Sequence, residues 1–101
     1  MAQRPSRNQA TFDYAGNRLR QVFHDGDVEL EAISYPARSA FRYTFTVDLG
    51  YPQQFESSFL ITREDMLRGL ERPDEYEMLV QNRVEKAVRF ILAQTGRAEL
   101  V

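Results

Sequence analysis

The residues best placed to do chemistry together form the short run His24, Asp25, Gly26 and Asp27. A histidine side chain titrates near neutral pH, and a neighbouring carboxylate can orient it or share a metal ion with it. This run therefore predicts, at most, a metal half-site or an acid–base pair. It also fits an ordinary hairpin turn, because Asp-Gly readily adopts the positive φ that a two-residue loop needs. We favour the turn, since nothing elsewhere in the sequence is a clear further ligand.

Other catalytic patterns find no support in the sequence. The chain has no cysteine, and no serine stands in a Gly-x-Ser-x-Gly elbow. The 5 glycines are scattered, so none of them forms a phosphate-binding loop. We therefore predict no catalytic residue, no metal site, no cofactor, and a protein that is not an enzyme.

Length and charge narrow the class of protein. A chain of 101 residues fits one domain, and its formal net charge of −2 lacks the basic excess that nucleic-acid binding needs. Residues 1–9 are polar and aperiodic, which predicts a disordered tail before a single domain over 10–101. No apolar run is long enough for a membrane span, and the first residues do not resemble a secretory signal. We expect a cytoplasmic protein with no membrane partner, and its sequence broadly resembles those of small bacterial proteins.

Alternating polar and apolar residues predict strands over much of the first two thirds of the chain. The clearest strand covers 40–49, with one apolar face made by Phe41, Tyr43, Phe45, Val47 and Leu49. The pattern returns over 54–61, after the turn at 50–52. Earlier strands are expected over 28–33, 18–23 and 10–14, separated by the turns at Asp25-Gly26 and 15–17.

The hydrophobic period changes after Thr62, which predicts two helices. Thr62 can cap a helix over 63–71, whose apolar stripe is Met66, Leu67 and Leu70. Pro73 suits the first turn of a second helix that continues to about residue 94, before Gly96. Its core-facing residues are expected to be Tyr76, Val80, Val84, Ala87 and Ile91, with Leu79, Val88 and Phe90 beside them.

The predicted fold class is therefore α+β. Strands that precede helices favour an antiparallel meander of four to five strands, followed by two C-terminal helices packed on one face of the sheet. The aromatic face of the strand over 40–49 then belongs to the core and not to a binding site.

The leading functional hypothesis is a non-enzymatic protein-interaction or assembly module, acting as a homodimer or with another protein. It rests on apolar positions outside the core, Met78 and Leu92, and on arginines of the open sheet face, Arg42 and Arg20. Arg18 and Arg38 are expected near them on this face, where Glu29, Glu31 and Glu56 offset their charge.

Two other functions remain open. One is a small-ligand protein or weak enzyme with a pocket between the sheet and the helices. Its polar residues would be Tyr43, His24 and Arg42. The other is a nucleic-acid-associated regulator, which ranks third because the charge is nearly balanced.

Overall fold

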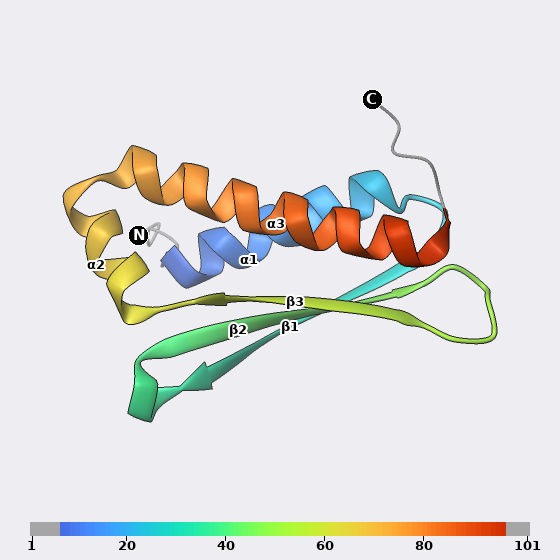
Figure 1. The fold of residues 1–101 in the computed structure, drawn as a ribbon, viewed down its shortest axis with the longest axis horizontal. Helices are drawn as coiled ribbons and strands as arrows, with labels where there is room; N and C mark the ends of the chain where they lie inside the picture. The colour runs from blue at the N-terminus through green and yellow to red at the C-terminus, as the bar shows by residue number, and fades with distance from the viewer. Residues whose placement is uncertain (1–6, 97–101) are drawn as a thin grey trace, which may run out of the picture.

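The computed structural model describes residues 7–96 of the chain and places them in an α+β fold (Figure 1). Its elements, in order, are α1 (Arg7–Val22), β1 (Asp27–Tyr35), a short 3₁₀ helix η1 (Pro36–Arg38), β2 (Ala40–Asp48), β3 (Phe55–Ile61), α2 (Arg63–Glu71) and α3 (Pro73–Thr95). Of the tail predicted over residues 1–9, residues 1–6 lie outside this description, and Arg7 already belongs to α1.

The three strands form an antiparallel meander in the order β1-β2-β3. Across the sheet, Val28 pairs with Val47, and Val47 pairs with Phe55. Because side chains alternate between the two faces, the odd-numbered residues of β2 share one face with the even-numbered residues of β1. This register sets which side chains meet the helices and which meet solvent.

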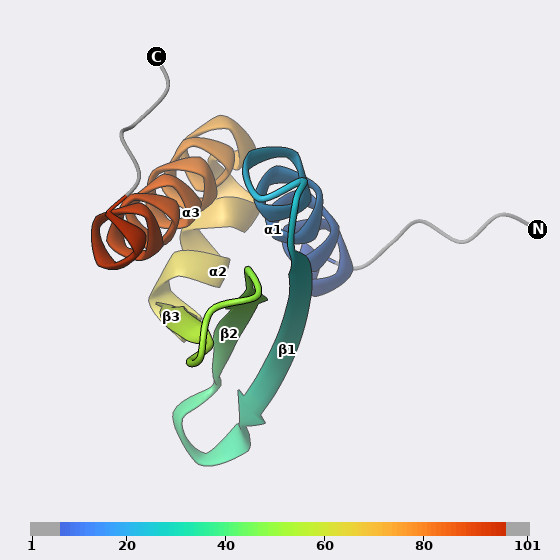
Figure 2. The ribbon, with the colours of Figure 1, turned by 90° about the vertical axis from the view of Figure 1, so that its right-hand side faces the viewer.

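Two helices cover one face of the sheet, and no helix among residues 7–96 covers the other. Figure 2 shows α1 above β1 and α3 above β3, with the two helices side by side. An ion pair ties them together: Arg18 Nε donates to Glu85 Oε1 over 2.6 Å, and Arg18 Nη2 donates to Glu85 Oε2 over 3.3 Å. The molecule is thus a two-layer structure with one open sheet face.

The core lies between the helices and the aromatic face of β2, as the sequence predicted. Tyr43 and Phe45 are fully buried, and the ring of Phe59 stacks on Tyr43 with centroids 4.9 Å apart. From α3, the predicted residues Tyr76, Val80, Val84, Ala87 and Ile91 all contribute to this core. Phe90 does not, because its side chain lies at the flank of the helix and is 56% exposed.

The number of strands was predicted wrongly. In place of strands over 10–14 and 18–23, the chain forms α1, so within residues 7–96 the sheet has three strands and not four to five. The residues Thr11, Ala15, Leu19 and Phe23 recur every fourth position and are all buried, which is a helical stripe. Gly16 looked like a turn residue, but it lies inside α1 where the helix passes close to Leu30 of β1.

The Asp25-Gly26 turn joins a helix to a strand and is not a hairpin. Gly26 has no positive φ; instead, a Cβ there would lie 2.6 Å from the carbonyl oxygen of Asp48. Glycine is therefore needed at this position for close backbone approach, and not for a left-handed conformation.

The two C-terminal helices lie close to their predicted bounds. Thr62 and Asp65 form a capping box at the start of α2, Pro73 opens α3, and Gly96 ends it with a φ of 69°. The apolar stripe of α2 was predicted wrongly, because Asp65, Met66 and Gly69 face the rest of the protein while Leu67 and Leu70 are exposed. Within residues 7–96, no helix is long and apolar enough to cross a membrane.

Candidate protein-interaction surface

The outer half of β1 and the turn after it form an exposed arm at one end of the sheet. We call residues 31–39 the hairpin arm; every one of them is exposed. The arm is nevertheless regular, since β1 pairs with β2 without interruption as far as Tyr35 and Ala40. Figures 1 and 2 show its end, which carries η1, away from both covering helices.

Apolar and aromatic side chains gather on the open sheet face along this arm and on the neighbouring strands. Ile33, Arg42 and Leu60 form one row across the three strands, and Tyr35 follows one step farther along β1. Their exposed fractions are 36% for Ile33, 37% for Tyr35 and 39% for Leu60. We call these four residues the arm patch.

Arg42 lies on the middle strand, β2, and its side chain contacts Tyr35 of the arm patch. Its guanidinium carbon lies 5.8 Å from the centroid of the Tyr35 ring, which is within cation–π range. An exposed guanidinium near an aromatic ring can still donate to a carboxylate. The patch therefore combines apolar area with a positive charge.

The other end of the open face is acidic. Glu29 and Glu56 flank Thr46 in one row, and Asp27 pairs with Asp48 in the row at the end of the sheet. Arg42 and Arg38 belong to the opposite end, while Arg18 and Arg20 lie on α1. The four arginines that were expected together on the open face are thus divided: Arg38 and Arg42 belong to the sheet layer, and Arg18 and Arg20 to the helix layer.

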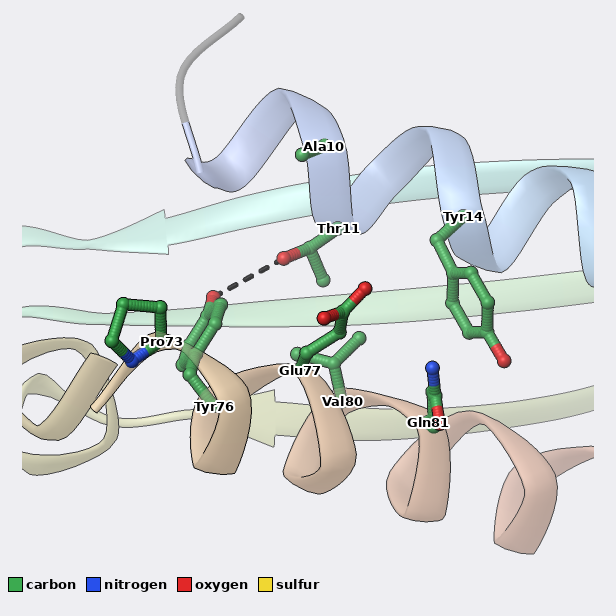
Figure 3. Close-up of a pocket in the computed structure, with 8 residues that line it drawn as sticks. All are labelled: Ala10, Thr11, Tyr14, Pro73, Tyr76, Glu77, Val80 and Gln81. Atoms are coloured by element: carbon green, nitrogen blue, oxygen red, sulfur yellow. Dashed lines mark hydrogen bonds between the residues drawn. The ribbon is translucent and has the colours of Figure 1, made fainter. Parts of the chain in front are cut away.

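A small cavity opens between α1 and the first turns of α3 (Figure 3). It has a volume of about 250 Å³, and Thr11 and Tyr76 meet at its wall with their hydroxyl oxygens 3.1 Å apart. Glu77 and Gln81 also line it, whereas His24 and Arg42 do not. This cavity is therefore a gap between two helices, smaller than most ligand sites, and not the predicted pocket between sheet and helices.

Tyr43 lies in the core below these helices. Burial raises the pKa of its phenol to about 12, aided by Tyr76 and opposed by a hydrogen bond with Thr11. Tyr43 is fully buried and does not line the cavity, so it has the position of a structural residue.

The histidine and carboxylates of residues 24–27 lie at the opposite end of the sheet from the arm. His24, Asp25 and Asp27 are exposed, and they share a shallow groove with Asp48 and Gly50. Among the described residues, no group of three or more His, Cys, Asp or Glu side chains is arranged to hold a metal ion.

The predicted interface residues do not meet on one surface. Met78 is 63% exposed on α3, whereas Leu92 is partly buried against the core. Arg20 lies on α1 beside Leu30 and Glu31, and only Arg42 belongs to the arm patch. Sequence reasoning missed Ile33, Tyr35 and Leu60. The alternation in β1 pointed to Ile33, since it is an apolar residue in register with glutamates.

No protein-family model, curated protein or solved structure matches this chain. What the molecule does must therefore be argued from its own surface.

Proposed function

We propose that the protein is a non-enzymatic interaction module that binds another protein through the hairpin arm and the arm patch. The observation that carries this proposal is an ordered strand segment in which residues 31–39 are all exposed, including the apolar side chains of Ile33 and Tyr35. Strand pairs exposed on both faces are marginally stable in water, so a partner that covers the arm would gain apolar contact without reordering the backbone.

The arm patch suits a partner other than a second copy of the chain. A twofold axis along the strands would set Arg42 against its own copy and the acidic rows against each other. A twofold axis across the strands at the row of Arg42 would also set Arg42 against its own copy. An axis across the middle of the sheet would place Ile33 and Leu60 over Glu29 and Glu56 of the second copy. Each of these arrangements opposes like charges or buries carboxylates against apolar groups.

The distribution of charged and apolar residues on the open sheet face also indicates the chemistry of the partner. An apolar side chain would fit beside Ile33 and Leu60, and a carboxylate would bind Arg42 in the plane of its guanidinium. Basic groups would face Glu29 and Glu56 at the other end of the sheet. Such complementarity fixes orientation more than it adds affinity.

The two other hypotheses have weaker support. A small-ligand function would rely on the cavity of about 250 Å³ between α1 and α3 or on the groove of about 430 Å³ between β3 and α3, and neither is lined by Tyr43, His24 or Arg42. Nucleic-acid binding would bring phosphates to a sheet face where Glu29, Glu56, Asp27 and Asp48 outnumber the arginines.

A double variant of the arm tests the proposal. Ile33→Ser with Tyr35→Ser removes the exposed apolar area, and we expect it to change the free energy of unfolding by less than about 1 kcal/mol, because exposed side chains contribute little to folding. The variant and the wild type are used as bait in an extract of the source cells. A partner retained by the wild type should be lost from the variant.

Met78→Ser is the matched control, because Met78 is exposed on α3, outside the arm. A partner that survives the arm substitutions, or one that the Met78 variant loses equally, would contradict the proposed surface. Unfolding of the double variant at ordinary temperature would show instead that the arm belongs to the core.

A further inference from the structure

The outer edge of β3 is a second place where a chain can bind, separate from the arm. In the described sheet the order is β1-β2-β3, so β3 pairs with β2 on one side only. Such an edge presents unpaired backbone N–H and C=O groups, which an extended segment can meet by adding a strand.

A hydrogen bond from Arg83 identifies the backbone groups that point outward. Arg83 Nη1 donates to the carbonyl oxygen of Leu60 over 2.8 Å, so this carbonyl points away from β2. In an antiparallel strand every second residue directs its N–H and C=O to the same side. The backbone groups of Ser58 and Glu56 therefore also point to the open edge.

A groove runs along this edge, between β3 and α3. It has a volume of about 430 Å³ and is lined among others by Ser58, Phe59, Leu60, Lys86 and Ala87. The small side chains of Ser58 and Ala87 leave room for an added backbone. The groove is thus open beside Ser58, whereas at Leu60 the outward carbonyl already accepts from Arg83.

The helix wall of the groove has a defined chemistry. Arg83, Lys86 and Ala87 line the groove, and Phe90 lies one helical turn beyond Lys86 on the same side of α3. Arg83 is already engaged, since its Nη1 donates to Asp65 Oδ2 over 2.6 Å. Lys86 makes no ion pair within residues 7–96, and the ring of Phe90 is 56% exposed.

We propose that this groove takes an extended, acidic segment of another protein, which adds to β3 as a fourth strand. A carboxylate of the segment pairs with Lys86, and an apolar side chain two or more positions along it covers Phe90. A second copy of the chain fits poorly, because a twofold axis between two β3 edges would bring the two Lys86 side chains together. The inference does not depend on the arm.

The test uses three capped six-residue peptides in which valine alternates with glutamate, lysine or glutamine. Each is titrated into the isotope-labelled full chain while backbone amide shifts are followed by NMR. We expect shifts over 56–60 and 83–90, and an affinity for the glutamate peptide at least about fivefold higher than for the lysine peptide.

Three variants locate the effect. Lys86→Glu should reverse the order of the glutamate and lysine peptides, since it reverses the charge on the groove wall. Ser58→Pro should abolish binding of all three, because it removes an edge-facing N–H from a strand where proline is tolerated. Arg68→Glu, an equal charge change on an exposed residue of α2 outside the groove, should leave the affinities unchanged.

Other outcomes would overturn the proposal. Equal affinity for the three peptides, no shift with any of them at millimolar concentration, or shifts outside the groove would exclude an acidic strand as its occupant. Sedimentation of the wild type as a dimer that Ser58→Pro dissociates would assign the edge to a second copy. Aggregation of the Lys86→Glu variant without peptide binding would show that Lys86 only guards the edge.

Discussion

Asp65 connects three parts of the protein through one carboxylate. Its Oδ2 accepts from the Thr62 backbone N–H over 2.9 Å and from Arg83 Nη1 over 2.6 Å, while its own N–H donates to Thr62 Oγ1 over 3.2 Å. Burial alone would raise the pKa of this carboxyl, but the hydrogen bonds from Arg83 and Thr62 outweigh burial and lower it. The charged form is therefore the one that stabilises the fold.

We predict that Asp65→Asn lowers the free energy of unfolding at pH 7 by about 2 kcal/mol, through the capping box and the partly buried pair. Because the folded pKa lies below the unfolded value, this stabilisation is present above about pH 4 and is lost as the pH falls toward the folded pKa. Urea unfolding should therefore show a shallower acid dependence for the variant. Glu64→Gln, an exposed neighbour, serves as control, and an acid dependence identical to that of the wild type would contradict the assignment.

Tyr43 gives the complementary prediction at high pH. Its pKa of about 12 in the folded chain exceeds the ordinary value, so the folded state holds the proton more tightly. The contribution of Tyr43 to the free energy of unfolding should be constant below about pH 10. It should be lost between about pH 10 and 12, so the wild type loses roughly 2 kcal/mol more than Tyr43→Phe over this range. Tyr51→Phe, at an exposed site, should keep the alkaline loss, and equal slopes for all three proteins would refute a buried phenol.

At the scale of elements, the junction of α1 and β1 requires glycine at position 26, because a side chain there would clash with the end of β2. A Cβ on Gly26 would meet both the Asp48 carbonyl oxygen and Leu49 Cδ2 at 2.6 Å, and the backbone oxygen moves only with β2 itself. We predict that Gly26→Ala lowers the free energy of unfolding by about 1–3 kcal/mol.

Gly50→Ala is the matched comparison in the same chemical denaturation series. Gly50 has a φ of 83° but open space where a Cβ would lie, so its cost is the conformational strain of about 1 kcal/mol. A smaller loss for Gly26→Ala than for Gly50→Ala would contradict the close approach of the two segments.

The helices α2 and α3 and the strands β2 and β3 were predictable because their signals are local. Thr62, Pro73 and Gly96 mark helix ends through capping chemistry, and β2 alternates without a break. The helix α1 was missed because Gly16 and Asn17 interrupt its stripe with residues typical of turns. A Cβ at Gly16 would lie 3.6 Å from Leu30 Cδ2, an ordinary packing distance, so the contact with β1 does not require glycine there.

The candidate surface was less predictable than the fold. Arg42 was identified from the alternation in its own strand, but Ile33 and Leu60 become its neighbours only through the register of the three strands. The exposure of the arm depends on where α1 and α3 end relative to β1, which is a property of tertiary packing. Residues such as Met78 and Leu92 share a helix, yet packing exposes one and partly buries the other.

For the molecule as a whole, the central claim is that a partner covers the hairpin arm. Hydrogen exchange, measured by mass spectrometry on the free protein and on the complex with a partner retained by the wild type, tests this claim directly. We predict that binding slows exchange over residues 31–42 and leaves α1 and α3 unchanged, because only the arm and its neighbouring strand are buried. Slower exchange confined to the helices, with no change over 31–42, would contradict the account.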